Sequence, residues 1–445
     1  LPPGEAEMEP LSHYIQIGSR KKYPPYASFG GNKGHADIFA DFLRDAGIER
    51  PPAAAGSRAI LDAPRAPDIR SFEEGARSYH AIKERLRGLR REKIAAFVEK
   101  THRPLRPDIS ELRFTREDDP LVTILVPAYN EYEHTLECLA SIGEAGEAAY
   151  EVLLADDAST DPRMREFSRI ENLRIVRSDT NQGFLRNCNN AFAQARGKYL
   201  FLLNNDAVLR RDAVSTLYRH AQQLRRPAIL GLPQYDIETG VLIDRGSLLD
   251  PFMNPVPNLD PGRRDVAMVM GACFWIPKAL WDELGGFPEW FGSLAEDLYL
   301  CCLARLRGVP VMVPNESGYD HWVGRSFRGG KVVRNALQTS YRRRALSERN
   351  KTFTMCICCP PPASFMLISM HLLALAAEGL ILSIMKRNSR VFCDIYWFAL
   401  KEVWREKARL AGLRRIAQAA KRISSRRFFS VFTPLPHKLN MLLRY

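Results

Sequence analysis

Carboxylate and amide side chains gather in three short clusters in the first half of the chain. Oxygen ligands of this kind suit Mg²⁺ or Mn²⁺ bound jointly with a diphosphate. Crowded carboxylates also repel one another unless a cation or a polar ligand compensates. Taken singly, each cluster could equally be a helix cap or a turn. The clusters are Pro127-Ala128-Tyr129-Asn130-Glu131, Asp156-Asp157-Ala158-Ser159-Thr160-Asp161 and Asn204-Asn205-Asp206.

Each cluster directly follows an apolar run that has the length of a β-strand. The run over 121–126 is continuously apolar apart from one threonine, as is typical of a strand buried on both faces. Strands separated by helices indicate a parallel α/β sheet, whose ligands bind at the carboxyl ends of the strands. All three clusters should therefore lie along one edge. The predicted strands are 121–126, 151–155, 173–176 and 198–203, and the predicted helices are 135–142 and 184–196.

Two further groups of residues could take part in chemistry. Glu296-Asp297 opens a helical stretch, where the helix N-terminus favours ionised carboxylates. The pair could supply a base for an acceptor hydroxyl, or it could simply cap a structural helix. His321 could be a metal ligand or a structural histidine. The nearby Arg325 and Arg328 could clamp phosphate oxygens or could be surface charges.

The order and spacing of these pieces resemble the family-2 glycosyltransferases with the GT-A fold. The likeness is strongest to the rhamnosyltransferase-like branch of bacterial surface polysaccharide synthesis, and it runs from Val122 to Ser326. Each piece is short, and together they make the resemblance specific. The matching pieces are Val126-Pro127-Ala128-Tyr129-Asn130, Asp156-Asp157-Ala158-Ser159, Asn181-Gln182-Gly183-Phe184 with Asn187 and Asn190, Leu203-Asn204-Asn205-Asp206, Gly271-Ala272, Gly285-Gly286-Phe287, Glu296-Asp297 and His321.

The resemblance implies an inverting, metal-dependent hexosyltransferase. Its base would be Asp297, with Glu296 as the second choice, and Asp206 with His321 would hold the divalent cation. The donor would be a nucleotide sugar, with dTDP-rhamnose or a UDP-sugar as candidates, and the acceptor a glycan or a polyprenyl-linked glycan. The implied nucleotide-sugar contacts are Pro127, Ala128, Tyr129, Asn130, Asp156, Asp157, Phe184, Arg186, Asn204, Asn205 and Arg325.

Two positions depart from the family's usual pattern. Asn204 and Asn205 stand where relatives commonly have an Asp-x-Asp, so cation affinity without the nucleotide should be weak. Tyr299 replaces an aspartate that many relatives carry after the acid pair. These departures leave open a catalytically degenerate domain that acts as a glycan- or membrane-binding scaffold. A nucleotidyltransferase or a nicotinamide oxidoreductase is disfavoured, because no Gly-rich loop follows the first strand.

Length and charge limit which partners and which domain division the protein can have. The 445 residues carry a formal net charge of +13, which indicates either a solvated basic surface or an anionic partner. No nucleic-acid recognition motif is present, so we expect no nucleic-acid partner. We divide the chain into a mostly helical N-terminal extension and linker over 1–119, a GT-A domain over 120–355 and a C-terminal helical region over 356–445.

The C-terminal region combines an apolar stretch with basic flanks. Residues 363–385 could cross a bilayer, lie in one leaflet or be buried in a soluble core. Basic residues on both sides disfavour simple spanning. We expect this region to associate with a membrane surface at the cytoplasmic face of the bacterial inner membrane, as a peripheral or monotopic protein.

Overall fold

The computed structural model describes residues 107–437, except 144, 146–147, 238–239, 323–330, 334–335 and 339, and only the backbone of 331–333 and 336–338. By backbone proximity, Leu1–Leu105 with Glu238–Val241 form one unit, and Arg106–Ile237 with Leu242–Tyr445 form another. The fold below is that of the second unit. The predicted N-terminal extension, up to residue 106, lies outside the described residues.

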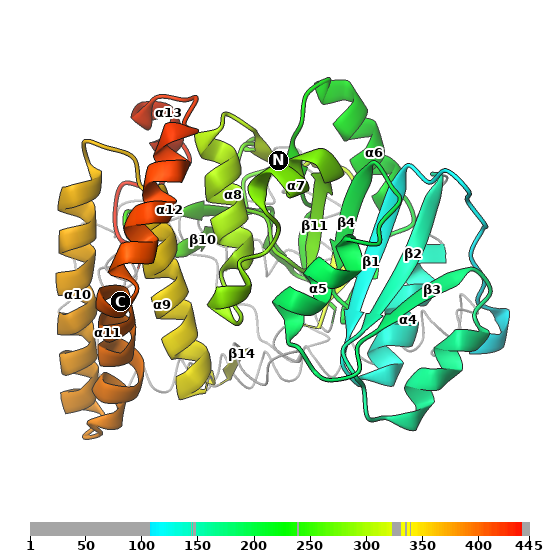
Figure 1. The fold of residues 1–445 in the computed structure, drawn as a ribbon, viewed down its shortest axis with the longest axis horizontal. Helices are drawn as coiled ribbons and strands as arrows, with labels where there is room; N and C mark the ends of the chain where they lie inside the picture. The colour runs from blue at the N-terminus through cyan, green and yellow to red at the C-terminus, as the bar shows by residue number, and fades with distance from the viewer. Residues whose placement is uncertain are drawn as a thin grey trace, which may run out of the picture. The chain divides into compact units, whose positions relative to one another are not determined.

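A seven-stranded sheet forms the centre of this unit, in the order β12-β6-β11-β4-β1-β2-β3 (Figure 1). Pairing is parallel except along β11, which runs antiparallel to both of its neighbours. The four predicted strands are confirmed as β1 to β4. The strands are β1 (Val122–Ala128), β2 (Tyr150–Asp156), β3 (Leu173–Arg177), β4 (Tyr199–Leu203), β6 (Ile229–Leu230), β11 (Cys273–Pro277) and β12 (Val311–Met312).

The sheet is covered by helices on both faces. Because successive strand residues point to opposite faces, Ile124 packs with α4 and α6 on one side, while Leu125 packs with α5, α7 and α8 on the other. All seven residues of β1 are buried, as predicted for a central strand. The covering helices are α4 (Tyr132–Gly143), α5 (Phe184–Phe192), α6 (Ala213–Leu224), α7 (Lys278–Leu284) and α8 (Glu296–Leu306).

The helix predicted over 184–196 ends earlier than expected, at Phe192. The chain then turns into the sheet, where the Arg196 N–H donates to Glu151 and the Gly197 N–H donates to the hydroxyl of Thr123. A Cβ atom on Gly197 would lie 2.4 Å from the Thr123 nitrogen. This close approach to β1 is a tertiary contact that a helical pattern does not reveal.

A second sheet, in the order β5-β13-β7-β8, lies beyond the end of β4. β13 pairs antiparallel with β5 and sets His321 opposite Ala207. Because Asp206 directly precedes β5, this pairing carries the third polar cluster to His321. The strands are β5 (Ala207–Leu209), β7 (Gln234–Asp236), β8 (Leu242–Asp244) and β13 (Tyr319–His321); the hairpins β9–β10 (Ser247–Leu249, Pro255–Pro257) and β14–β15 (Lys331–Val333, Ala336–Gln338) complete the strands.

Helices follow the sheets, and α9 packs directly against α8, α11, α12 and η6 (Figure 1). The boundary predicted between residues 355 and 356 falls inside α9. The predicted α/β class, with a mostly parallel sheet flanked by helices and a helical C-terminal region, is confirmed. The helices are α9 (Tyr341–Cys358), α10 (Ser364–Met385), η6 (Phe392–Trp397), α11 (Phe398–Arg405), α12 (Lys407–Ala419) and α13 (Ser425–Phe429), and three short helical turns are η3 (Ile109–Glu111), η4 (Pro162–Arg169) and η5 (Glu289–Phe291).

Candidate active site

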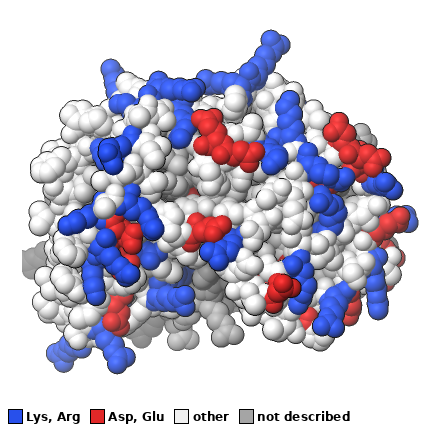
Figure 2. All heavy atoms as spheres, viewed as in Figure 1, with Lys and Arg blue, Asp and Glu red and all other residues white. Residues whose placement is uncertain are grey.

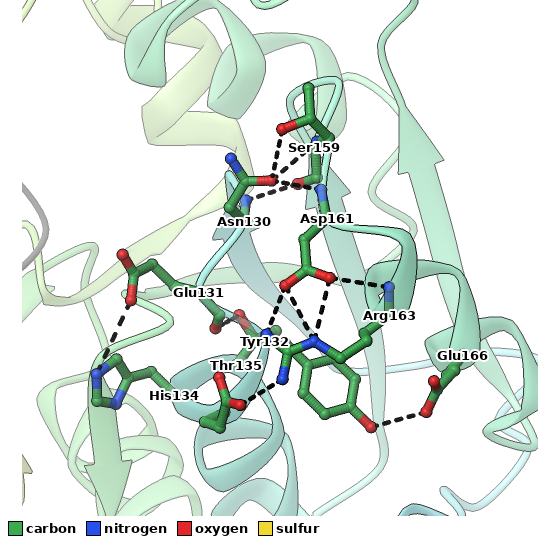
Figure 3. A network of polar contacts seen from close by, with 11 residues as sticks. Asn130, Glu131, Tyr132, His134, Thr135, Ser159, Asp161, Arg163 and Glu166 are labelled. Carbon is green, nitrogen blue, oxygen red and sulfur yellow. Dashed lines mark hydrogen bonds and ion pairs between the residues drawn. The ribbon is translucent and has the colours of Figure 1, made fainter.

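The carboxyl end of β1 is tied to that of β2 through Asn130. Asn130 and Glu131 have φ values of 59° and 58°, a left-handed conformation that asparagine tolerates better than most residues. The Oδ1 of Asn130 accepts from the N–H groups of Thr160 at 2.8 Å and Asp161 at 2.9 Å. In Figure 3 its amide nitrogen points away from this turn. The oxygen predicted to line a nucleotide pocket is therefore already engaged, and the amide remains to face a ligand.

The other predicted residues of this segment differ in exposure. Pro127 and Ala128 are buried at the end of β1, and the Ala128 carbonyl accepts from the Asp157 N–H at 2.9 Å. They shape the rim through the backbone rather than through exposed side chains. Tyr129 is 48% exposed, so its ring is the part of this segment open to a ligand.

The two aspartates after β2 hold neighbouring loops. Asp157 accepts from the N–H groups of Gln182 at 2.7 Å and Gly183 at 2.8 Å. Gly183 has φ 84°, which disfavours any other residue, and it directly precedes α5. Asp156 accepts from the Ser159 N–H and pairs with Arg177. Both buried aspartates therefore fix the loops on which Phe184 and Arg186 stand.

Arg186 is less free than the sequence suggested. Its Nε donates to Glu289 at 2.9 Å, and the Phe184 ring lies 6.0 Å from that of Phe287. Asn189 bonds both the N–H and the carbonyl of Phe287, which closes the link between α5 and the loop before α8. Neither Asn189 nor Glu289 was predicted, because their contacts span about a hundred residues of sequence.

The first two residues of the cluster after β4 contact the loop before β11 and helix α4. The Asn204 N–H donates to the Ala272 carbonyl at 3.0 Å, and Asn205 donates to the hydroxyl of Thr135 on α4. The buried Oδ1 of Asn204 has no hydrogen-bond partner among the described residues. Buried polar atoms are nearly always satisfied, so this oxygen marks a place where a ligand would supply the partner.

Asp206 and His321 lie side by side, with Oδ1 and Nε2 3.0 Å apart. Two ligand atoms that are both about 2.1 Å from an octahedral cation, at a right angle to each other, also lie about 3 Å apart. The other imidazole nitrogen bonds Gln234, whose side-chain oxygen accepts from the Tyr319 hydroxyl. The spacing of the two atoms fits two neighbouring positions of a divalent cation, and the Gln234 contact holds the imidazole ring.

The described residues contain no group of three or more His, Cys, Asp or Glu side chains placed to hold a metal. A cation at Asp206 and His321 would therefore need oxygens from its substrate. The predicted Arg325, with its neighbour Arg328, lies outside the described residues.

The acid pair begins α8 and is buried. The Asp297 carboxylate accepts from the N–H groups of Gly271 at 2.9 Å and Leu298 at 2.7 Å. Burial raises the pKa of Asp297, and these two N–H groups oppose the rise. Burial and the neighbouring Asp297 charge raise the pKa of Glu296 to about 8, against a lowering by Arg343. The Glu296 Oε2 is buried without a partner among the described residues.

The loop before β11 joins the carboxyl end of β4 to the start of α8. The Gly271 N–H donates to Asp297, and the carbonyl of the next residue, Ala272, accepts from the Asn204 N–H. Because β1 pairs parallel with both β2 and β4, the carboxyl ends of these strands lie at one edge of the sheet. The structure therefore brings the carboxyl ends of β2 and β4 and the start of α8 to a shared rim. Burial and the charges of Asp206 and Asp297 raise the pKa of the Tyr319 phenol well above its ordinary range.

Tryptophans of this half of the domain are packed. Trp275 and Trp281 are buried. The Trp290 ring stacks on Phe353 of α9, with centroids 5.3 Å apart. A helix distant in sequence therefore covers the loop that carries Trp290.

Comparisons with known proteins find similarity over part of this chain. Residues 123–285 match the sequence model of Glycosyl transferase family 2. The chain is 28% identical over 211 residues to the uncharacterized protein y4gI of Sinorhizobium fredii, covering 45% of this chain and 22% of that protein. It is 25% identical over 233 residues to the N-acetylglucosaminyl-diphospho-decaprenol L-rhamnosyltransferase of Mycobacterium tuberculosis, covering 45% of this chain and 76% of that protein. The crystal structure of S. aureus TarS 1–349 has a TM-score of 0.44 at 16% identity, over 70% of this chain and 89% of that one.

The chain thus spans about a fifth of the length of the rhizobial relative. The matched residues include the carboxyl ends of β1, β2 and β4, where Asn130, Asp157 and Asp206 lie. The acid pair and His321 follow after the match. Over residues 123–285, this chain is thus similar to the glycosyltransferases of family 2.

Proposed function

We propose that this protein is an inverting glycosyltransferase of bacterial polysaccharide synthesis. It would transfer a hexose from a nucleoside diphosphate to a glycan or a polyprenyl-linked acceptor. The observation that carries the proposal is the shared rim. Asp206 lies beside His321, and Asp297 of the buried acid pair bonds Gly271, whose neighbour Ala272 bonds Asn204. The mycobacterial relative, by its name a rhamnosyltransferase for a decaprenyl-diphosphate-linked sugar, supports a rhamnose donor and a lipid-linked acceptor.

In this proposal Asp206 and His321 hold Mg²⁺ or Mn²⁺ together with the donor diphosphate. The cation would neutralise charge on the departing nucleoside diphosphate. The Asn204 oxygen lies at the same strand end and would accept a hydrogen bond from the donor or a bound water. Asparagine at 204 and 205 leaves less negative charge than two aspartates would, so the diphosphate must contribute to cation affinity.

The acid pair divides the proton chemistry. Asp297, held by two backbone N–H groups, is the ionised member and takes the proton from the acceptor hydroxyl. The acceptor oxygen bonds to the anomeric carbon as the bond to the phosphate oxygen on the opposite face breaks. The leaving nucleoside diphosphate takes that electron pair. Glu296, whose pKa is raised to about 8, keeps its proton near pH 7 and donates a hydrogen bond to a sugar hydroxyl.

The nucleotide would lie along the β1–β2 side of the rim. Tyr129 offers an exposed ring on which a base can stack. The Asn130 amide would donate to a base or ribose oxygen, and the Asp157 carboxylate would accept from a base N–H or a ribose hydroxyl. The Arg186 guanidinium would give up or share its hydrogen bond with Glu289 in order to bind a phosphate oxygen.

We further propose that α10 attaches the protein to the cytoplasmic face of the inner membrane. Its polar residues face the protein: His371 bonds Thr352, and Glu378 bonds Arg344 and the hydroxyl of Tyr396. Only 17% of the residues in the most apolar 18-residue segment of this helix are buried, so a helix in a soluble core is disfavoured. Its exposed apolar residues are Phe365, Met366, Met370, Leu373, Leu380, Ile381, Ile384 and Met385.

The neighbours of α10 favour insertion into one leaflet over a span. The helix packs against η6 and α9, so a full crossing would carry Arg344 and much of α9 into hydrocarbon. In Figure 2 the outer edge over α10 is largely white, while Lys and Arg gather beside it. Exposed Lys386, Arg387 and Arg390 follow its last turn and suit anionic head groups. A lipid-linked acceptor would be presented at this surface.

The experiment is a donor screen on the purified full chain, with thermal stability and nucleoside diphosphate release as readouts. We expect one nucleotide sugar, with dTDP-rhamnose and UDP-sugars in the panel, to stabilise the protein only when Mn²⁺ or Mg²⁺ is present. At a hundredfold excess over Kd the gain is about 2.7 kcal/mol. Nucleoside diphosphate release should then require Asp297. Stabilisation without any release or transfer would favour a glycan-binding scaffold, and a lack of response to every nucleotide sugar would reject the proposal.

A further inference from the structure

We propose that Asn350, on α9, is a positioning residue for the acid pair at the start of α8. It lies outside residues 123–285, and no predicted site residue is its neighbour in sequence. The inference rests on the proposed function, because it concerns the residues that would remove the acceptor proton. It assigns the C-terminal helices a part in catalysis besides membrane attachment.

Asn350 is fully buried and faces the loop that leads into α8. Its Nδ2 lies 2.6 Å from the carbonyl oxygen of Ser293, 2.8 Å from that of Leu294 and 3.2 Å from that of Phe291. One amide nitrogen thus contacts three carbonyl oxygens of the loop. These carbonyls precede Glu296 by two to five residues, so the clamp acts next to the acid pair.

The loop needs such a clamp because its backbone is unfavourable. Leu294 and Ala295 have φ values of 70° and 62°. The left-handed conformation costs an L-residue roughly 1–2 kcal/mol, and two in succession persist only where the surroundings enforce them. The Ala295 carbonyl then accepts from the Tyr299 N–H in the first turn of α8. The conformation of this dipeptide therefore sets where the Glu296 and Asp297 side chains begin.

The orientation of the Asn350 amide follows from its other partner. Arg349 donates from Nε to the Asn350 Oδ1 at 2.9 Å, which leaves the amide nitrogen facing the loop. Arg349 also donates from Nη2 to the Phe291 carbonyl at 2.5 Å, and its guanidinium lies 5.5 Å from the centre of the Phe353 ring. The two adjacent residues act as one polar clamp.

Aromatic packing holds the same loop from a second helix. Trp290 stacks on Phe353, and the guanidinium of Arg409 on α12 lies 5.4 Å from the centre of the Trp290 ring. The loop is thus enclosed by α9 and α12, both C-terminal to the matched family domain. Loss of the Asn350 bonds should let Leu294 and Ala295 relax while this packing keeps the loop in place.

The expected consequence is a selective loss of turnover. The donor-side residues Asp157 and Asp206 stand on β2 and β4, which Asn350 does not contact. Asn350→Ala should therefore lower kcat by about 10²-fold, the scale of a displacement near 1 Å at a reacting group, with donor Kd unchanged within about twofold. Arg349→Met keeps the aliphatic stem and should give a smaller loss in the same direction.

Thr354→Val provides the matched control. Thr354 is equally buried on α9, and its hydroxyl bonds the Asn350 carbonyl of its own helix. We expect Thr354→Val to lower stability slightly and to leave kcat unchanged. Hydrogen exchange of the full chain supplies a readout that needs no activity: amides 291–299 should exchange faster in Asn350→Ala, and at the wild-type rate in Thr354→Val.

The outcomes separate the two proposals. Unchanged exchange of 291–299 in both Asn350→Ala and Arg349→Met would overturn the clamp. Equal losses of kcat and donor affinity, shared by Thr354→Val, would reduce Asn350 to a purely structural residue and overturn its positioning role. If the wild type transfers no sugar from any donor, the proposed function fails, whereas the exchange comparison still decides whether Asn350 holds the acid-pair loop.

Discussion

At the scale of single residues, Glu296 and Asp297 are neighbours in sequence with different surroundings. Asp297 receives two backbone N–H bonds, whereas the Glu296 Oε2 is buried without a partner among the described residues. Two adjacent carboxylates whose environments separate their proton affinities are a common arrangement for acid and base roles. The family resemblance alone chose Asp297 over Glu296 as the base only from its position in the motif.

We predict that Asp297→Asn keeps donor binding and loses transfer. Removing a base typically costs 10²–10⁴-fold in rate, and the amide preserves the size of the side chain. Donor-induced thermal stabilisation and product formation, measured on the same preparation, check this. Asp282→Asn, at an exposed position of α7, serves as the control. Full transfer by Asp297→Asn would exclude Asp297 as the base.

The raised pKa of Glu296 predicts a pH dependence of stability. Its pKa moves from an ordinary 4.5 to about 8 in the folded protein, so the folded state binds the proton more tightly between these values. The contribution is complete below about pH 4.5 and is lost as pH rises through 8. Burial is the main cause of the raised pKa of Glu296, the Asp297 charge adds to the rise, and Arg343 on α9 opposes it.

Glu296→Gln should flatten this slope. Melting temperatures measured from pH 5 to 8 should fall more steeply in the wild type than in the variant. Asp244, whose pKa burial raises to about 7, contributes the same sign to both proteins, so the difference between them isolates Glu296. Parallel curves for the two proteins would contradict the assignment.

Asp206→Ala tests the cation site. Because Asp206 and His321 are the two protein ligands in the proposed site, loss of the carboxylate should abolish Mn²⁺-dependent stabilisation by the donor. Asp282→Ala should retain it. A variant that still gains full stability from donor and Mn²⁺ together would move the cation away from Asp206.

At the scale of elements, packing against α9 and η6 decides how α10 lies. Gly379 faces Tyr396, and a Cβ atom there would be 2.6 Å from the Cγ of that ring. Adding a single methyl group at Gly379 should therefore push α10 away from η6. Gly412 on α12, by contrast, has nothing within 4 Å of such a Cβ atom.

We predict opposite effects for alanine at these two glycines. Gly379→Ala should destabilise the protein by about 1–3 kcal/mol through overpacking. Gly412→Ala should stabilise it by about 0.5–1 kcal/mol, because alanine restricts the unfolded chain and favours helix. Denaturant unfolding of both variants checks the pair. The same sign for both would mean that α10 does not pack on Tyr396 as described.

At the scale of the whole described unit, the C-terminal helices share a core with the central sheet. Leu125 of β1, Phe353 of α9, Leu410 of α12 and Phe428 of α13 belong to one buried cluster. A boundary near residue 355 therefore marks a change in composition within a continuous core. If α10 attaches to a lipid surface, this continuous core would hold the rim of the sheet at a fixed distance and orientation from that surface.

The membrane proposal predicts binding to anionic vesicles. The full chain should bind vesicles that contain phosphatidylglycerol, and more weakly as salt increases. Leu373→Ser combined with Ile384→Ser, at positions 72% and 76% exposed, should weaken binding at least about tenfold, because each apolar side chain contributes on the order of 1–2 kcal/mol. Ile175→Thr on β3 is the control. Binding unaffected by the double substitution would exclude α10 as the attachment surface.

The sequence by itself determined the strands β1 to β4, their polar ends and the resemblance to a family. Continuous apolar runs predict buried strands whatever the rest of the chain does, and parallel strands place their carboxyl ends together. The Asn204-Asn205-Asp206 and Glu296-Asp297 motifs could be predicted as site residues because their side chains have the chemistry that such a site needs. The early end of α5 was missed because Gly197 packs on Thr123, a contact 74 residues away.

Only the tertiary structure decided which of these residues meet and what holds them. Asp206 touches His321 because β5 pairs with β13, across 115 residues of sequence. Asn350 binds the Leu294 carbonyl across 56 residues, and His371 and Glu378 turn inward because α9 and η6 offer them partners. Local patterns set the type of an element. Contacts between distant segments depend on how the elements pack, and that packing cannot be predicted from any single segment of the sequence.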